Sequence, residues 1–188
     1  MTTTQRTPPS RGSTRLVAFA LAVGLLGPLS PASAQTATPT PTPTPVKTET
    51  QIIGNWKLTC TEFSDPKTPR QCIIGLEARA KTNNQAVFAW TIGLDKNGNL
   101  VSRMVTLPGV SIPPGVDLKI GNAAIRKLMY STCEPTFCSL EAPIDAAFRK
   151  ELTGSDKATV VVYGSTGKNM TIELAIGGGD KALAVMKK

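Results

Sequence analysis

The chain has 188 residues, 40% of them hydrophobic and 5% aromatic, with 21 basic residues, 13 acidic residues and no histidine. The lack of histidine excludes Ser-His-Asp and Cys-His nucleophile systems and most catalytic zinc sites. The basic residues occur singly or in doublets, and only two Trp and two Tyr accompany them, so we expect no nucleic-acid partner.

Residues 1–34 have the layout of a secretory signal peptide. Three arginines precede the apolar run "LVAFALAVGLL", and Ala32-Ser33-Ala34 forms an A-x-A cleavage site before Gln35. The run has 11 residues, whereas a spanning helix needs about 20, which disfavours the alternative of a retained membrane anchor. Cleavage would leave 18 basic and 13 acidic residues, a net charge of +5 instead of +8. We expect a periplasmic, secreted or surface-associated protein without an integral membrane segment.

The segment "QTATPTPTPTPVKTET" (residues 35–50) contains four successive Thr-Pro pairs. Proline fixes φ and disfavours helix in the residue before it, so the composition predicts an extended linker without a core of its own. One folded domain is expected over residues 51–188.

Alternation of apolar and polar residues indicates β-strands throughout that domain. "ATVVVYG" and "KNMTIELAI" are predicted to form one hairpin, and "QAVFAWTIGLD" and "LVSRMVTLP" another, joined by the Asn-Gly turn of "KNGN". "IIGNWKLTC", "CIIGLEARA" and "AIRKLMYSTC" are further candidate strands. The residues expected on the buried faces of the two hairpins are Phe88, Trp90, Ile92, Leu94, Met170, Ile172, Leu174 and Ile176.

About eight short strands at close spacing predict an all-β fold, an antiparallel β-sandwich of immunoglobulin-like or jelly-roll-like type. Two short helices are expected, in "PIDAAFRKEL" before Gly154 and in "GGGDKALAVMKK". We expect these helices to cover the open ends of the sandwich.

The four cysteines are Cys60, Cys72, Cys133 and Cys138. An even number in an exported domain implies disulfides, and three pairings are open. We favour Cys60–Cys72 and Cys133–Cys138, because each pair flanks a turn-rich segment. A four-cysteine zinc site is the alternative, but the usual C-x₂₋₄-C spacing matches only the second pair. We therefore expect neither a metal nor a cofactor.

The loop over residues 107–116 is the candidate contact surface, because the end loops of a sandwich commonly carry binding functions. Its residues of interest are Pro108, Gly109, Pro113, Pro114 and Gly115. The alternative interpretation is a rigid crossover between strands.

Three segments keep a characteristic order and spacing: "GNWKLTC" followed by Cys72, "LPGVSIPPGVDLKIG" and "STCEPTFCSLEAPIDAAFRKEL". Over residues 51–188 the chain resembles the invasion-associated locus B proteins of alphaproteobacteria. The resemblance implies an exported, disulfide-bonded β-sandwich in which the four cysteines are structural bridges, and it carries over no catalytic residue. The family takes its name from host-cell entry by an intracellular pathogen. The Thr-Pro linker is a departure from the family.

Two functional hypotheses follow from the sequence. The first is a non-enzymatic binding or envelope-associated protein, whose partner is an unidentified protein or envelope component and whose role could extend to host or surface interaction. The second is an exported hydrolase or redox enzyme without histidine. That enzyme would need converging carboxylates or a reactive thiol.

Overall fold

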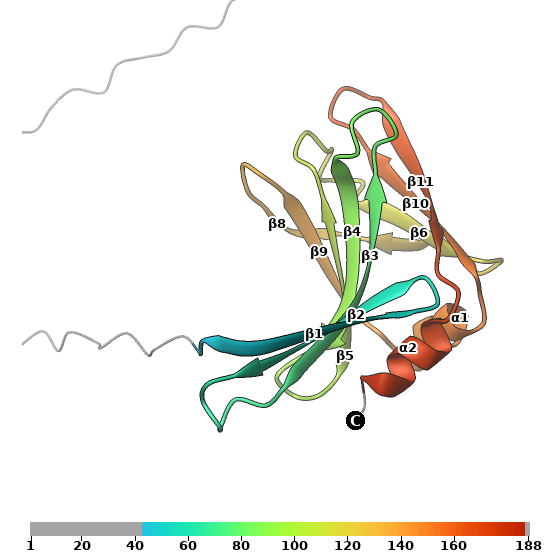
Figure 1. The fold of residues 1–188 in the computed structure, drawn as a ribbon. Helices are drawn as coiled ribbons and strands as arrows, with labels where there is room; N and C mark the ends of the chain where they lie inside the picture. Colours follow the sequence, from blue (N-terminus) through green and yellow to red (C-terminus); the bar gives the residue numbers. More distant parts are fainter. Residues whose placement is uncertain (1–42, 187–188) are drawn as a thin grey trace, which may run out of the picture. The chain divides into compact units, whose positions relative to one another are not determined.

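The alternating strands form two antiparallel sheets that face each other in a computed structural model, which describes residues 43–186 (Figure 1). The predicted signal peptide and its cleavage site lie outside the described residues. In spatial order, the large sheet contains β1 (Pro45–Ile53), β2 (Trp56–Phe63), β3 (Gln71–Arg79), β4 (Ala86–Leu94), β5 (Leu100–Thr106), β9 (Cys138–Pro143) and β8 (Tyr130–Cys133). The small sheet contains β11 (Asn169–Ala175), β10 (Lys157–Tyr163), β6 (Val116–Ile120) and β7 (Arg126–Leu128). The predicted antiparallel β-sandwich is confirmed.

Two tryptophans occupy the centre of the core between the sheets. Trp56 and Trp90 are fully buried and meet edge to face, with ring centroids 5.6 Å apart. Each indole N–H is satisfied: Trp56 Nε1 donates to the carbonyl of Ile176 and Trp90 Nε1 to Ser102 Oγ, both at 2.8 Å. A buried indole without a partner would cost about 1–3 kcal/mol. These hydrogen bonds therefore fix the orientation of both rings.

The two hairpins predicted from turn signals are present. β4 pairs with β5 through a turn in which Gly98 has a φ of 80°, and β10 pairs with β11. Six of the eight residues expected on their buried faces are buried, whereas Met170 is half-buried and Leu94 is exposed. Leu94 lies on the same face as Ile92 but is 47% exposed, because the core does not extend over this end of the sheet.

The first strand begins before the expected start of the domain. The sequence predicts a linker over residues 35–50, but β1 runs from Pro45 and pairs with β2 over its whole length. Pro45 is the first residue of an edge strand, where the missing N–H is tolerated. Strand pairing with β2 therefore outweighs the Thr-Pro composition of this segment.

Two segments predicted as single strands are each divided. "IIGNWKLTC" turns at Gly54-Asn55 between β1 and β2. Gly54 has a φ of 61°, and a Cβ there would clash with the carbonyl oxygen of Gly177. "AIRKLMYSTC" is interrupted at Met129, where the chain passes from β7 in the small sheet to β8 in the large sheet.

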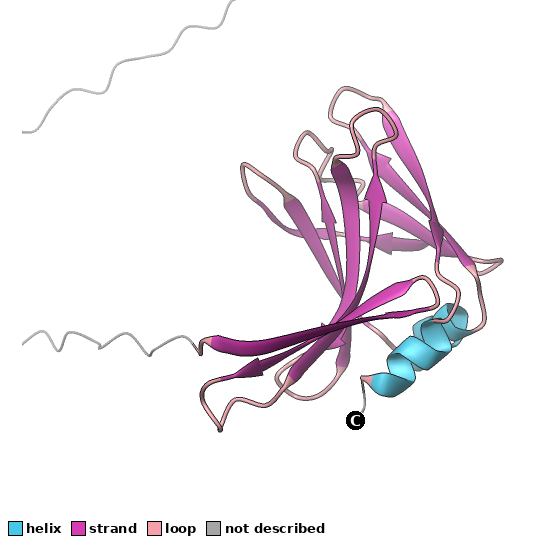
Figure 2. Cartoon of the chain, viewed as in Figure 1, coloured by secondary structure: helices cyan, strands magenta, loops and turns pink. Residues whose placement is uncertain are grey.

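Both predicted helices are present, α1 (Ala146–Thr153) and α2 (Gly179–Val185), and they contact each other at one end of the sandwich (Figure 2). They do not cover separate ends. Asp145 caps α1 by accepting a hydrogen bond from the N–H of Phe148. Arg126 of β7 joins α1 to the small sheet by two hydrogen bonds to Glu151, 2.8 and 2.9 Å long, and by lying over the Phe148 ring. No helix among residues 43–186 is long and apolar enough to cross a membrane.

Candidate functional site

The structure contains two disulfides, Cys60–Cys72 and Cys133–Cys138. Each joins directly opposite residues of neighbouring antiparallel strands, with Cα atoms 4.0 Å apart. All four cysteines are bonded, so none is a free thiolate that could ligate zinc in this structure. Within residues 43–186, no group of three or more His, Cys, Asp or Glu side chains is placed to hold a metal ion.

Strand register brings the first disulfide to the floor of a groove. Cys60 is opposite Glu49 on one side and Cys72 on the other. On β4, Leu94 lines the same groove, two residues beyond Ile92, which is opposite Ile74. The row of Glu49, Cys60 and Cys72 lies on the inner face of the large sheet, at the end that the core leaves open. We call this site the disulfide groove. Its volume is about 1030 Å³, and its apolar lining is formed by Leu58, Cys60, Cys72, Leu94, Val185 and Met186.

Helix α2 forms one wall of the disulfide groove. Its last residue, Val185, is 39% exposed, and the following Met186 is buried. Leu94 remains 47% exposed in the same groove. Apolar side chains that remain solvent-exposed within a large concavity are typical of a binding site.

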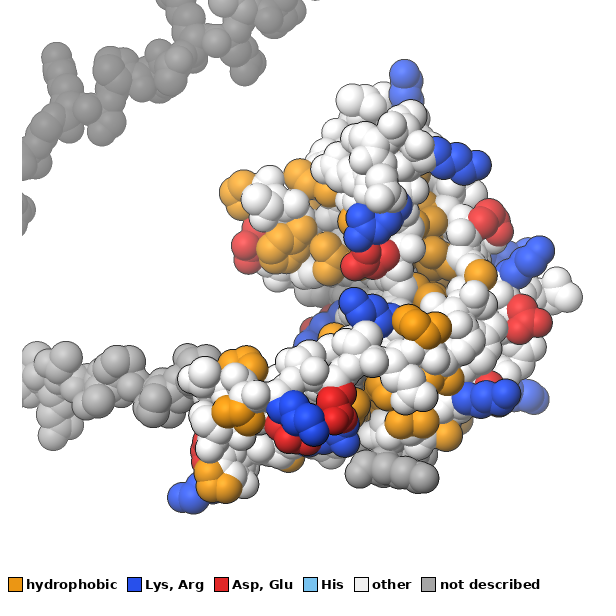
Figure 3. All heavy atoms as spheres, in the orientation of Figure 1, with side chains coloured by type: hydrophobic (Ala, Val, Ile, Leu, Met, Phe, Trp, Pro, Cys, Tyr) orange, Lys and Arg blue, Asp and Glu red, His pale blue; other side chains and the backbone are white. Residues whose placement is uncertain are grey.

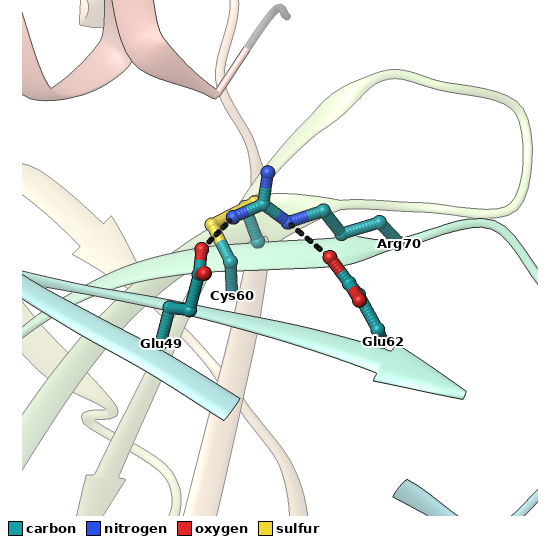
Figure 4. The surroundings of a disulfide bond; sticks show 5 residues. Glu49, Cys60, Glu62 and Arg70 are labelled. Carbon is teal, nitrogen blue, oxygen red and sulfur yellow. Dashed lines mark hydrogen bonds and ion pairs between the residues drawn. A yellow bond between two sulfur atoms is a disulfide. The ribbon is translucent and has the colours of Figure 1, made fainter. Parts of the chain in front are cut away.

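A charged cluster borders the disulfide (Figure 4). The Arg70 guanidinium lies between two carboxylates, 2.6 Å from Glu49 and 3.9 Å from Glu62, and Lys47 is 2.8 Å from Glu49. The hydrogen bond from Lys47 and the charges of Lys47 and Arg70 lower the pKa of Glu49. Exposed ion pairs of this kind add little to stability. Their effect here is to hold the Arg70 side chain beside the groove.

A second hollow, of about 560 Å³, lies between the outer face of the large sheet and the end of β11, and it is the weaker candidate. Lys57, Gly75 and Thr91 are opposite one another across β2, β3 and β4 and form its floor. Figure 3 shows this face hollowed above the β1–β2 hairpin. The apolar surface of this hollow is smaller than that of the disulfide groove.

The predicted contact loop does not line the disulfide groove. The backbone of Ser111 donates to the carbonyl of Tyr163, and that of Ser165 donates to the carbonyl of Gly109, which ties the loop to the β10–β11 hairpin. Pro108, Gly109 and Pro113 are exposed, Pro114 is half-buried and Gly115 is buried. These contacts agree with the alternative interpretation of the loop as a rigid crossover.

Alanine at Gly115 is expected to destabilise the fold far more than alanine at Gly109. Both glycines have positive φ, 66° at Gly115 and 90° at Gly109, but only at Gly115 would a Cβ clash with another atom, the carbonyl oxygen of Leu128. We expect a loss of roughly 1–2 kcal/mol for Gly109→Ala from the left-handed backbone alone. For Gly115→Ala we expect more than about 3 kcal/mol, because the backbone must also move. Urea denaturation of the two variants measures the difference, and equal losses would contradict this account.

Sequence reasoning found the cysteines but missed the groove around them. Glu49 falls in the predicted linker, and Arg70 lies in the turn-rich segment between Cys60 and Cys72, so the sequence predicts neither as a site residue. Strand pairing is the signal that could have connected Glu49 with the cysteines. If residues 45–53 are recognised as a strand that pairs with β2, Glu49 lies opposite Cys60. Val185 was not singled out, because its exposure depends on where α2 ends relative to the sheet.

Comparison with known proteins gives the family. The family described as "Invasion associated locus B (IalB) protein" matches residues 56–187. A solved structure, that of invasion-associated protein B from Bartonella henselae, superposes with a TM-score of 0.63 at 16% sequence identity, covering 74% of this chain and 95% of that chain. At this identity the likeness concerns the fold. None of the curated proteins matches the sequence. The chain belongs to the invasion-associated locus B family.

Proposed function

We propose that this protein is an exported, non-enzymatic binding protein of the cell envelope that holds its partner in the disulfide groove. One observation carries the proposal: Leu94 and Val185 leave apolar surface exposed within a groove of about 1030 Å³ whose floor is a disulfide. A cross-linked floor holds the site in one shape, which lowers the entropy cost of binding.

Export is supported by the disulfides, since such bonds persist in oxidising compartments such as the periplasm and the cell surface. The signal-peptide pattern of residues 1–34 supports the same location. The names of the family and of the Bartonella protein refer to invasion. For this chain we propose only a role at the envelope, with a protein or an envelope component as the partner.

Lysine at Leu94 or at Val185 is expected to weaken partner binding by at least about tenfold, because it places a charge on the apolar lining. The matched control is Ile112→Lys, at a 50% exposed residue of the contact loop outside the groove. A photo-crosslinking residue at each of the three positions, used in intact cells, would identify what lies against each surface. Crosslinking to the same partner from position 112 but not from the groove would contradict the proposal and favour the loop.

A further inference from the structure

The disulfide groove lies beside a free edge of the large sheet. Within residues 43–186, β1 pairs with β2 and with no other strand, and eight of its nine residues are exposed. A strand with an unpaired edge is a template onto which another extended chain can add.

The spacing of the cysteines shows which β1 backbone groups are free. A Cα separation of 4.0 Å between Cys60 and Cys72 is close to the ~4.5 Å of a non-hydrogen-bonded pair and far from the ~5.5 Å of a hydrogen-bonded one. Because a strand residue directs its N–H and C=O to the same side, Cys60 directs both toward Glu49 on β1. Glu49 therefore bonds to β2, and its neighbours Thr48 and Thr50 direct their N–H and C=O groups away from the sheet.

The groove and the free edge are continuous at Thr50. Thr50 lines the groove. It is opposite Thr59, whose neighbours Leu58 and Cys60 face the core, so the side chains of Thr59 and Thr50 both point to the outer face. The part of Thr50 that borders the groove is therefore its backbone. A strand added beside β1 would place every second side chain on the inner face, next to Glu49 and Gln51 and over the groove.

The charges around the groove favour a neutral, apolar occupant. Glu49 and Glu62 are paired with Lys47 and Arg70. Asp95, also on the rim, accepts hydrogen bonds from the N–H groups of the turn that follows β4, and the next residue, Lys96, adds a positive charge to the same rim. The rim therefore presents balanced charges above an apolar floor.

We propose that the occupant of the disulfide groove is an extended segment of a protein partner. It adds to the large sheet beside β1 through the backbone groups of Thr48 and Thr50, and it directs alternate apolar side chains into the groove. This inference rests on the proposed function and specifies its ligand. The backbone contacts supply affinity with little sequence preference, and the groove selects apolar residues at every second position.

The test uses the full-length protein with both disulfides formed. The probe is an acetylated octapeptide of alternating valine and threonine, and its control carries proline at alternate positions. Amide exchange followed by NMR should show rapid exchange at Thr48 and Thr50 in the free protein and about tenfold slower exchange with the probe. Glu49 and Gln51 should be protected in both states, and the proline peptide should have no effect.

Thr50→Pro removes the free donor without breaking a bond to β2, so we expect it to lower probe affinity by about tenfold or more. Thr50→Val keeps the backbone N–H and should bind like the native protein. If Thr50→Pro binds normally while Leu94→Lys does not, strand addition is wrong and the groove function stands. If neither variant affects binding, both proposals fail. A last outcome concerns the free protein without probe. If amide exchange at Thr48 and Thr50 slows as the protein concentration rises, a second copy of the chain occupies the edge and the inference is wrong.

Discussion

Replacing Cys60 and Cys72 together with alanine is expected to lower the free energy of unfolding by about 3 kcal/mol, because the disulfide closes a loop between residues 12 apart. The matched variant, Cys133→Ala with Cys138→Ala, removes a bond between residues 5 apart. It should cost about 2 kcal/mol by the same loop-closure argument. Urea denaturation without reductant measures both losses.

The two double variants should also differ in function. Cys60 and Cys72 form the floor of the disulfide groove. Cys138 lies in register with Phe88 through β5, at the other end of β4 from Leu94. We therefore expect loss of the first disulfide to weaken partner binding and loss of the second to leave it unchanged when both variants are measured well below their melting temperatures. Equal effects on binding would show that the groove acts only through overall stability.

Local signals made part of this fold predictable. The Asn-Gly turn at Asn97-Gly98 predicts the β4–β5 hairpin, and the turn-rich segment within each cysteine pair favours the pairing that the structure contains. These features depend on residues that are close in sequence. For the same reason the two helices were found from their own apolar spacing and from Gly154.

The site itself depends on contacts between distant segments. Leu94 has the same alternation as Ile92, yet Ile92 is fully buried and Leu94 is not, because burial depends on where the opposing core ends. The change of sheet at Met129 follows from the pairing of β7 with β6 and of β8 with β9, which a single run of apolar residues does not reveal. The start of strand β1 could not be predicted from its own residues, because its sequence continues the Thr-Pro linker. The strand is stabilised by its pairing with β2.

Replacing Trp56 is expected to have the largest effect of any substitution that we propose. Trp56→Ala should lower the free energy of unfolding by about 3–5 kcal/mol through the cavity it leaves. Trp56→Phe should lower it by about 1–3 kcal/mol, because the buried carbonyl of Ile176 loses the indole N–H that now donates to it. Thermal and urea unfolding measure these losses.

Trp56 also connects the core to the wall of the groove. Its Nε1 atom lies 3.5 Å from where a Cβ would project at Gly179, the first residue of α2, and the same helix ends at Val185 in the disulfide groove. Trp56→Phe should therefore speed amide exchange in α2 and weaken partner binding. The control is Trp90→Phe, which loses a hydrogen bond of equal length but to the side chain of Ser102. If Trp90→Phe loosens α2 as much as Trp56→Phe does, the helix is held by the core as a whole and not by the bond from Trp56 to Ile176.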